Sequence, residues 1–132
     1  MTLVLDASAA VAVLVDKGAD GRWARRQLAT GSAAAPHLML AEAANILRRA
    51  TLSGEISVDT ASLAHADLLD LDVELFDYRP LAARAWQLHE NVTIYDGWYV
   101  ALAESLAVDL ITLDRRLARA SGCLCAFRTP DE

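Results

Sequence analysis

The chain has 132 residues, enough for one hydrophobic core and too few for two, so we expect a single domain over residues 1–132. Its apolar fraction is 55%, but charged residues interrupt every long apolar run, which argues against a membrane span. The net charge is −6, which is unusual for a protein that holds nucleic acid by charge alone. The first residues lack the basic start of a signal peptide, so we expect a cytoplasmic protein.

In the first half of the chain, one strand is followed by a series of helices. A short apolar strand is predicted over residues 2–5. Helices are predicted over residues 8–15, 20–29, 37–52 and 57–70. Pro36 suits the first turn of the third helix, and Ser57 or Asp59 suits the N-cap of the fourth.

In the second half, strands and helices alternate. Strands are predicted over residues 73–76, 109–113 and 123–127, and helices over residues 80–90, 95–106 and from 115 to about 120. The last strand contains Cys123 and Cys125, which we expect to be reduced thiols because a disulfide across one intervening residue would be strained. Alternating strands and helices predict an α/β fold, a three-layer α/β/α sandwich around a parallel sheet of four to five strands.

Two aspartates directly follow buried strands of the predicted sheet. Asp6 comes after the strand over residues 2–5, and Asp114 comes after the strand over residues 109–113. Open parallel sheets bind ligands at the carboxyl ends of their strands, so both acids are candidates for a functional site. Each acid also suits the N-cap of the helix that follows it, and the pattern alone leaves that alternative open.

Glu42 is the single charged residue in the apolar helical segment over residues 38–47. Burying a carboxylate there without a partner would cost roughly several kcal/mol. We therefore expect a cation or metal ion to compensate the buried charge. The alternative is a glutamate at the helix edge that reaches solvent or pairs with Arg49.

Asp96 stands at the start of a strongly apolar helix, where it suits the N-cap. The neighbouring Gly97 permits close approach of backbone or ligand. Glu104 lies more than two turns further on and is expected on the exposed side of that helix. Four acids of this kind suggest Mg²⁺ or Mn²⁺, which prefer oxygen ligands and would offset the repulsion between an acidic site and phosphate.

Four stretches of the sequence, in this order and spacing, resemble the PIN-domain ribonucleases, and within them the VapC-type toxins of bacterial toxin–antitoxin pairs. The stretches are LDASA (5–9), LAEAAN (40–45), TIYDGWYVALAE (93–104) and LITLDRRL (110–117). Gly97 is a departure, because the family more often has alanine there. Each motif is weak alone, whereas all four in order are specific.

The resemblance implies a PIN-like fold and Mg²⁺- or Mn²⁺-dependent cleavage of RNA. By matched position, Asp6, Glu42, Asp96 and Asp114 form the acidic set. Asp6 and Asp96 are the foremost candidates for metal ligands, and Glu42 and Asp114 would bind a second ion or position water. Two further residues would hydrogen-bond to the acids through their hydroxyls without binding the metal: Ser8 and Thr112. The resemblance also implies a VapB-like antitoxin and a toxin homodimer.

Eleven of the 12 basic residues are arginine, which contacts phosphate through two N–H groups at once. The arginines that follow Asp114 are candidates for binding RNA: Arg115, Arg116 and Arg119. Solvated helix faces would also explain such clusters. Two other functions stay open at this point, a catalytically silent PIN-like protein-interaction module and a metal-dependent DNA nuclease.

Overall fold

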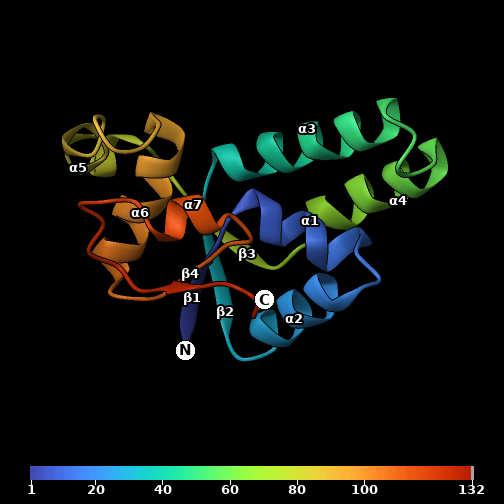
Figure 1. Ribbon diagram of the computed structural model, residues 1–132, viewed down its shortest axis with the longest axis horizontal. Helices are drawn as coiled ribbons and strands as arrows, with labels where there is room; N and C mark the ends of the chain where they lie inside the picture. The colour runs from blue at the N-terminus through green and yellow to red at the C-terminus, as the bar shows by residue number, and fades with distance from the viewer. Residues whose placement is uncertain (132) are drawn as a thin grey trace.

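The computed structural model describes residues 1–131 and shows a parallel five-stranded sheet between two layers of helices (Figure 1). The strands are β1 (Thr2–Leu5), β2 (Ser32–Pro36), β3 (Val73–Phe76), β4 (Leu110–Ile111) and β5 (Phe127–Arg128), in the spatial order β3-β2-β1-β4-β5. All pairs are parallel, and β1 lies in the centre, between β2 and β4. The predicted three-layer α/β/α fold is therefore confirmed.

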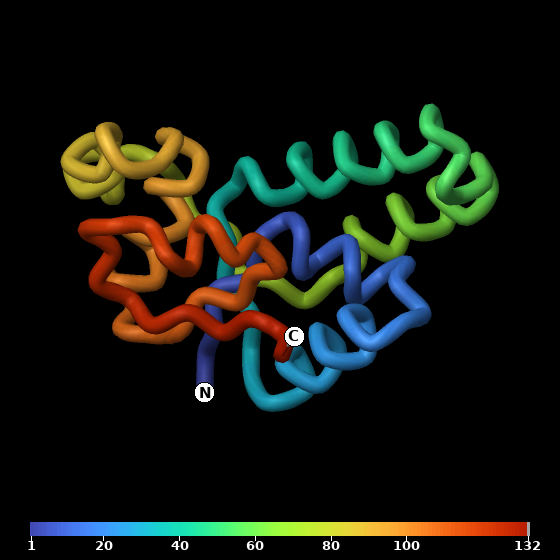
Figure 2. The backbone as a smooth tube through the Cα atoms, viewed as in Figure 1, coloured from blue at the N-terminus to red at the C-terminus, as the bar shows by residue number. Residues whose placement is uncertain are grey.

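The helices divide into two groups, one for each face of the sheet. They are α1 (Ala7–Val15), α2 (Ala19–Leu28), α3 (Leu38–Leu52), α4 (Val58–Leu69), the 3-10 turn η1 (Arg79–Leu81), α5 (Ala82–Gln87), α6 (Ile94–Leu106) and α7 (Arg115–Ala118). From β1 the chain adds β2 and then β3 on one side of β1, and it then crosses back to add β4 and β5 on the other side. Because crossovers between parallel strands are right-handed, this change of direction places α1–α4 on one face of the sheet and α5–α7 on the opposite face. Figures 1 and 2 show these two groups on either side of the strands.

The central strands are buried on both faces, as expected of a parallel sheet covered by helices. Leu3, Val4 and Leu5 of β1 are inaccessible to solvent or nearly so, as are Leu110 and Ile111 of β4. The apolar side chains of α6 pack on the opposite side of these strands from α1. No helix among residues 1–131 combines the length and apolar character that crossing a bilayer requires.

The prediction that Pro36 begins a helix is wrong, because Pro36 is the last residue of β2. The alanines before it pair with both β1 and β3, and Pro36 lies opposite Phe76 in that register. Proline is tolerated at the end of this strand, where the next amide, that of His37, makes the bond to the Phe76 carbonyl at 3.0 Å. An alanine run has weak strand propensity, which is why this strand does not stand out in the sequence.

Several other predicted elements are shorter than expected, and the strand predicted over residues 109–113 covers Leu110–Ile111 alone. The segment over residues 80–90 divides into η1 and α5 and ends in a turn, and the predicted strand over residues 123–127 is reduced to β5. Cys123 and Cys125 are free thiols, but they precede the strand instead of belonging to it. Burial raises the pKa of both thiols, that of Cys125 to about 12, so both stay protonated at neutral pH.

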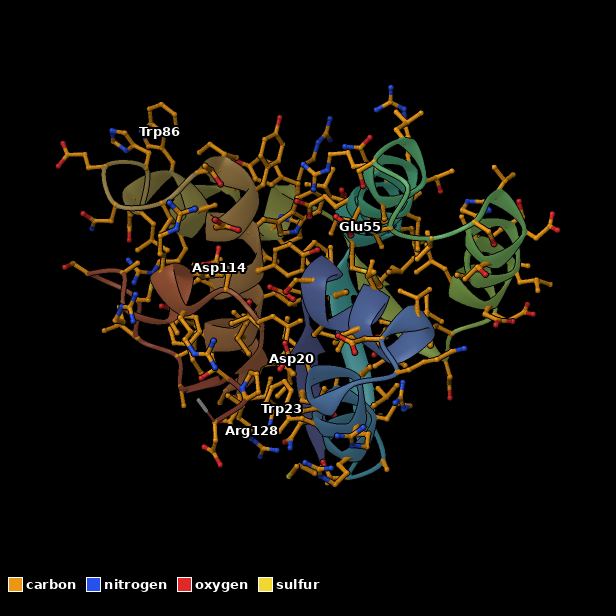
Figure 3. The ribbon with its side chains drawn as sticks, turned by 45° about the vertical axis from the view of Figure 1, so that its right-hand side comes forward. Asp20, Trp23, Glu55, Trp86, Asp114 and Arg128 are labelled. Atoms are coloured by element: carbon orange, nitrogen blue, oxygen red, sulfur yellow. The ribbon has the colours of Figure 1, made fainter. Side chains whose placement is uncertain are left out.

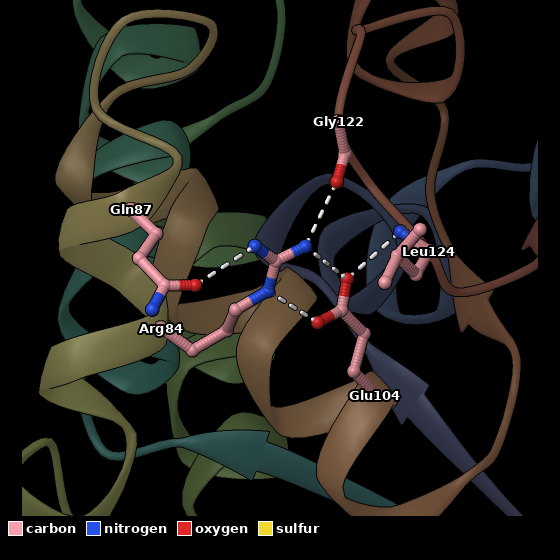
Figure 4. Close-up of polar contacts among 5 residues, drawn as sticks. All are labelled: Arg84, Gln87, Glu104, Gly122 and Leu124. Atoms are coloured by element: carbon pink, nitrogen blue, oxygen red, sulfur yellow. Dashed lines mark hydrogen bonds and ion pairs between the residues drawn. The ribbon is translucent and has the colours of Figure 1, made fainter.

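The segment before β5 is held to the helices by a pair of opposite charges (Figure 4). Arg84 of α5 donates two hydrogen bonds to Glu104 of α6, at 2.7 and 3.1 Å, and a third to the Gly122 carbonyl at 2.8 Å. Glu104 also accepts the Leu124 amide at 2.8 Å. The expectation that Glu104 faces solvent is wrong, since its side chain is 14% exposed and forms the centre of this network.

Candidate active site

Asp6 and Thr112 meet where the two central strands end. Leu5 of β1 lies beside Ile111 of β4, so the residues that follow them emerge side by side at the carboxyl edge of the sheet. The Thr112 hydroxyl donates a hydrogen bond to Asp6 Oδ2, and the Asp6 amide donates to the Ile111 carbonyl at 3.1 Å. Asp6 is 7% exposed and Thr112 is fully buried. The site therefore begins with a carboxylate fixed inside the fold.

The other oxygen of Asp6 is held by the start of α1. Asp6 Oδ1 accepts the Ser8 hydroxyl at 2.7 Å and the Ala9 amide at 2.9 Å, so Asp6 is also the N-cap of this helix. The Ser8 hydroxyl in turn accepts the Leu113 amide at 3.1 Å, which joins α1 to the segment after β4. The capping alternative is thus true of Asp6, and it fixes the carboxylate in one orientation at the sheet edge.

Burial raises the pKa of Asp6 above its usual value. The Thr112 hydroxyl, the Ala9 amide and the Ser8 hydroxyl act in the opposite direction, because they stabilise the charged form. The negative charge of Asp96 raises the pKa further. Since burial and a like charge outweigh three hydrogen bonds, a cation beside Asp6 would stabilise its ionised form.

Glu42 lies on α3 and is bound by a residue that the sequence analysis did not single out. The Tyr99 hydroxyl of α6 donates a hydrogen bond to Glu42 Oε1 at 2.9 Å. Arg49 is exposed and forms no ion pair with Glu42 among residues 1–131, so the alternative that Glu42 pairs with Arg49 is wrong. Burial raises the pKa of Glu42, the Tyr99 hydroxyl lowers it, and the charges of Asp96 and Asp6 raise it again, so that it lies above its usual value.

Asp96 lies in the first turn of α6, and the N-cap is Thr93. The Thr93 hydroxyl accepts the Asp96 amide at 3.1 Å, so the prediction that Asp96 is the N-cap is wrong. Threonine at this position satisfies an otherwise unpaired amide at the start of α6. Burial and the charge of Asp114 raise the pKa of Asp96, whereas Thr93 and Arg116 lower it less.

Gly97 next to Asp96 serves a packing contact. A Cβ atom built on Gly97 would lie 3.1 Å from the Ala85 carbonyl oxygen, so the missing side chain lets α5 approach α6 closely. The sequence left open whether Gly97 permits close approach of backbone or of a ligand, and the structure shows that it is the backbone of Ala85. Because Asp96 is the preceding residue, this contact fixes the start of α6 against α5.

Asp114 caps the short helix α7 and faces Asp96 across a pocket. Asp114 Oδ1 accepts the amides of Arg116 at 2.9 Å and Leu117 at 3.2 Å. Figure 3 shows Asp114 at the start of α7. A pocket of about 300 Å³ is lined by Asn91, Val92, Thr93, Asp96, Asp114, Arg116, Leu117 and Ala120.

The three arginines of the α7 region occupy different surroundings. Arg116 is exposed and lines the pocket with Asp96 and Asp114. Arg115 donates a hydrogen bond to the Pro130 carbonyl at 2.7 Å, so its side chain lies against the C-terminal segment. Arg119 is exposed beyond the end of α7. Of the three, Arg116 is the one that the structure places beside the acids.

The four acids interact through space as a chain of like charges. The charge of Asp96 raises the pKa of Asp6 and of Glu42, the charge of Asp6 raises that of Glu42, and the charge of Asp114 raises that of Asp96. Among residues 1–131, no three acidic, histidine or cysteine side chains already stand in an arrangement that would hold an ion. The donor chemistry nevertheless fits a hard divalent cation, because carboxylate oxygens are its preferred ligands and its charge would relieve the repulsion.

Comparison with known proteins gives a consistent family. The PIN domain model matches residues 3–122. Ribonuclease VapC1 of Mycobacterium tuberculosis is 44% identical over 126 residues, 95% of both chains, and Ribonuclease VapC12 of the same species is 39% identical over 120 residues, covering 91% of this chain and 92% of the relative. The chain therefore belongs to the PIN domain family, and within it to the VapC ribonucleases. The resemblance read from the four motifs is confirmed.

Solved structures agree with this assignment. PAE2754 from Pyrobaculum aerophilum superposes with a TM-score of 0.72 at 25% identity, over 96% of this chain and 83% of that one. VapBC-5 from Mycobacterium tuberculosis, a member of the VapBC toxin–antitoxin family, superposes with a TM-score of 0.59 at 26% identity, over 99% and 98%. FitAcB from Neisseria gonorrhoeae has a TM-score of 0.70 at 15% identity, over 97% of both chains, which is a likeness of fold.

Proposed function

We propose that this chain is the toxin of a VapBC-type pair and a Mg²⁺- or Mn²⁺-dependent endoribonuclease. The observation that carries the proposal is a group of three partly or fully buried carboxylates, Asp6, Glu42 and Asp96. Burial raises the pKa of each, and the charge of Asp96 raises the pKa of the other two. A fold keeps such a costly cluster when a ligand compensates it. The relatives VapC1 and VapC12 are named ribonucleases, and this supports RNA as the substrate.

Each acid has a part that follows from its surroundings. Asp6 and Asp96 are the principal ligands, and Glu42 and Asp114 hold a second ion or orient the attacking water. When bound, a divalent ion lowers the pKa of its water and stabilises the charge that develops on the phosphate. Ser8 and Thr112 keep the Asp6 carboxylate in one orientation by donating to different oxygens of it. That rigidity holds the ligand in place before the ion arrives.

The negative net charge of the protein repels RNA phosphates, so RNA binding requires local positive charge near the site. Arg116 lines the acidic pocket, so its guanidinium is placed to contact a phosphate next to the one that is cleaved. Arg119 is exposed at the end of α7 and would extend this contact, and Arg115 adds positive charge from its position against the C-terminal segment. These arginines supply local positive charge on a protein whose net charge is −6.

The proposed partners are a VapB-like antitoxin and a second copy of the chain. Structural neighbours include a VapBC2 complex from Rickettsia felis and a toxin–antitoxin complex from Klebsiella pneumoniae. Large apolar side chains that are more than half exposed offer surface for such contacts: Leu52, Val58, Leu63, Leu69 and Trp86. A basic antitoxin side chain would suit the acidic pocket, and the proposed site of action is the cytoplasm.

The test is incubation of purified protein with structured RNA in Mn²⁺, Mg²⁺ or EDTA. We expect cleavage with either metal, none with EDTA, and none with Asp6→Ala or Asp96→Ala. Asp72→Ala is the matched control, because Asp72 is exposed just before β3, at the opposite edge of the sheet from the acids. Circular dichroism verifies that each variant is folded.

Two results would favour the other functions. Cutting of duplex DNA without cutting of RNA would identify a DNA nuclease. Absence of any cleavage by folded, metal-loaded protein, together with tight binding to an antitoxin, would identify an interaction module. The presence of all four acids supports the enzyme, since an interaction module has no need of a repulsive cluster.

A further inference from the structure

Tyr99 joins the two helices that carry acids on opposite faces of the sheet. Its side chain is 2% exposed and belongs to the hydrophobic core. Its hydroxyl donates a hydrogen bond at 2.9 Å to Oε1 of Glu42, which is 57 residues away in sequence. The ring is therefore a core residue of α6, and the hydroxyl reaches the carboxylate of α3.

Packing alone does not account for the hydroxyl. A phenylalanine would fill the same space, and a buried hydroxyl without a partner would destabilise the fold. The partner here is a carboxylate that forms no ion pair with a basic side chain among residues 1–131. A glutamate side chain left unrestrained loses rotamer entropy when it binds an ion. The Tyr99 bond removes part of that freedom in advance.

The position of Tyr99 on α6 adds a second argument. Asp96 lies three residues earlier, so the two side chains share one face of the helix. The charges of Glu42 and Asp96 interact, which places the two carboxylates in one site. A single helix face thus presents one acid directly and holds another through a hydrogen bond, and the spacing between them is set by the rigid ring of Tyr99.

We infer that Tyr99 is a positioning residue that holds the Glu42 carboxylate ready for a divalent cation. The inference rests on the proposed function and deepens it, since it assigns a part in metal binding to a residue that is not an acid. Tyr99 acts through Glu42 and contacts neither ion nor RNA. One oxygen of Glu42 accepts the Tyr99 hydroxyl, so the other, Oε2, would be the ligand for the cation.

The experiment is a calorimetric titration of metal-free protein with Mn²⁺, which needs no activity. Tyr99→Phe keeps the ring and removes the hydroxyl, and we expect Mn²⁺ affinity to fall about 10- to 100-fold, the usual effect of losing an outer-shell partner. Tyr95→Phe is the matched control, because Tyr95 is on the same helix and 58% exposed. That variant keeps the affinity of the wild type. Unchanged affinity in Tyr99→Phe would overturn the inference.

A double-mutant cycle separates positioning from a general loosening of the helices. In a Glu42→Gln background, Tyr99→Phe is expected to cause no further loss of Mn²⁺ affinity, because its effect passes through the carboxylate. An equal loss in both backgrounds would overturn the inference. The two proposals can fail separately. If wild-type protein binds no Mn²⁺, the proposed metal site is wrong. If wild type binds Mn²⁺ and Tyr99→Phe binds it with the same affinity, only the inference about Tyr99 is wrong.

Discussion

The Thr112 hydroxyl donates a hydrogen bond to the Asp6 carboxylate, although 106 residues separate the two in sequence. The contact exists because β1 and β4 are neighbours in the sheet and end at the same level, with Leu5 beside Ile111. Thr112 is fully buried, and its hydroxyl also accepts a hydrogen bond from the Asp114 amide at 2.9 Å. The first and last acidic motifs are joined at this point.

Replacing Thr112 tests that junction. Thr112→Val removes the hydroxyl and keeps the shape. We expect a loss of about 1–3 kcal/mol in the free energy of unfolding, because a buried carboxylate oxygen and the Asp114 amide both lose a hydrogen bond. Urea unfolding of metal-free protein at pH 7 measures it. Thr2→Val at the start of β1 is the control, since its hydroxyl bonds to Ser32 in an exposed position, and a change within about 0.5 kcal/mol is expected. Equal effects of both variants would show that the contact contributes nothing.

The raised pKa of Asp96 predicts that this acid destabilises the metal-free fold at neutral pH. A carboxyl whose pKa is higher in the folded state favours folding when protonated, so its contribution is lost as pH rises from the ordinary value of 3.8 through the raised one. Asp96→Asn removes the charge, and we expect the metal-free variant to be more stable than the wild type at pH 7 by about 0.5–2 kcal/mol, with the difference vanishing toward pH 3.

The measurement is urea unfolding of both proteins from pH 3 to pH 8, without metal and then with saturating Mn²⁺. With Mn²⁺ the order reverses, because the wild type gains binding energy that the variant has lost. Asp72→Asn, at the far edge of the sheet, is the control and keeps the wild-type pH profile. A metal-free Asp96→Asn that melts well below the wild type at pH 7 contradicts the prediction.

The sequence predicts most of the fold and less of the site, for reasons that particular residues show. The short strands over residues 2–5 and 73–76 are predicted with the observed bounds. The alanine strand β2 has no clear strand signature, since small side chains suit a helix as well as a crowded central strand. Tertiary pairing with β1 and β3 decides its structure.

For the site, the position of an acid after a strand indicates where its carboxylate lies, which is why Asp6 and Asp114 are recognisable without a structure. Tyr99 is different, because nothing in a local pattern shows that a core tyrosine of one helix will meet a glutamate 57 residues away. Its spacing of three residues from Asp96 was the available signal. Glu104 was misplaced for a similar reason, since its partner Arg84 is on another helix.

Arg116 is predicted to bind an RNA phosphate. Arg116→Gln should weaken binding of a non-cleavable RNA to all sequences alike, and should reduce the slope of log affinity against log salt by about 1, because one fewer counterion is released. Fluorescence anisotropy at several salt concentrations measures both. Arg26→Gln, exposed on α2, is the control and keeps the wild-type slope. Identical salt slopes in wild type and Arg116→Gln would remove this residue from the RNA surface.

The Arg84–Glu104 pair is predicted to stabilise the segment before β5. Burial raises the pKa of Glu104, but the bonds from Arg84 and Leu124 outweigh it, so the pKa lies below its ordinary value of 4.5. Arg84→Met should lower the free energy of unfolding by about 1–3 kcal/mol at pH 7. The stabilisation is present above the ordinary pKa and is lost as pH falls through the lowered one, so the difference from wild type shrinks in acid.

Hydrogen exchange of residues 120–126 locates this effect, and urea unfolding at pH 7 and pH 3 gives its size. Arg79→Met, exposed on η1, is the control. Protection of the segment that is unchanged in Arg84→Met would show that the strand pairing of β5 holds it without the ion pair.

The central claim is that the protein cleaves RNA at the acidic site where β1 and β4 end. This claim is tested most directly in cells. Wild type and Asp96→Asn are expressed under a controlled promoter to equal protein levels, and the 5′ ends of cellular RNA are sequenced. Discrete new ends that appear with the wild type and are absent with Asp96→Asn are predicted. The same new ends with both proteins, or none with folded wild type, would contradict the claim.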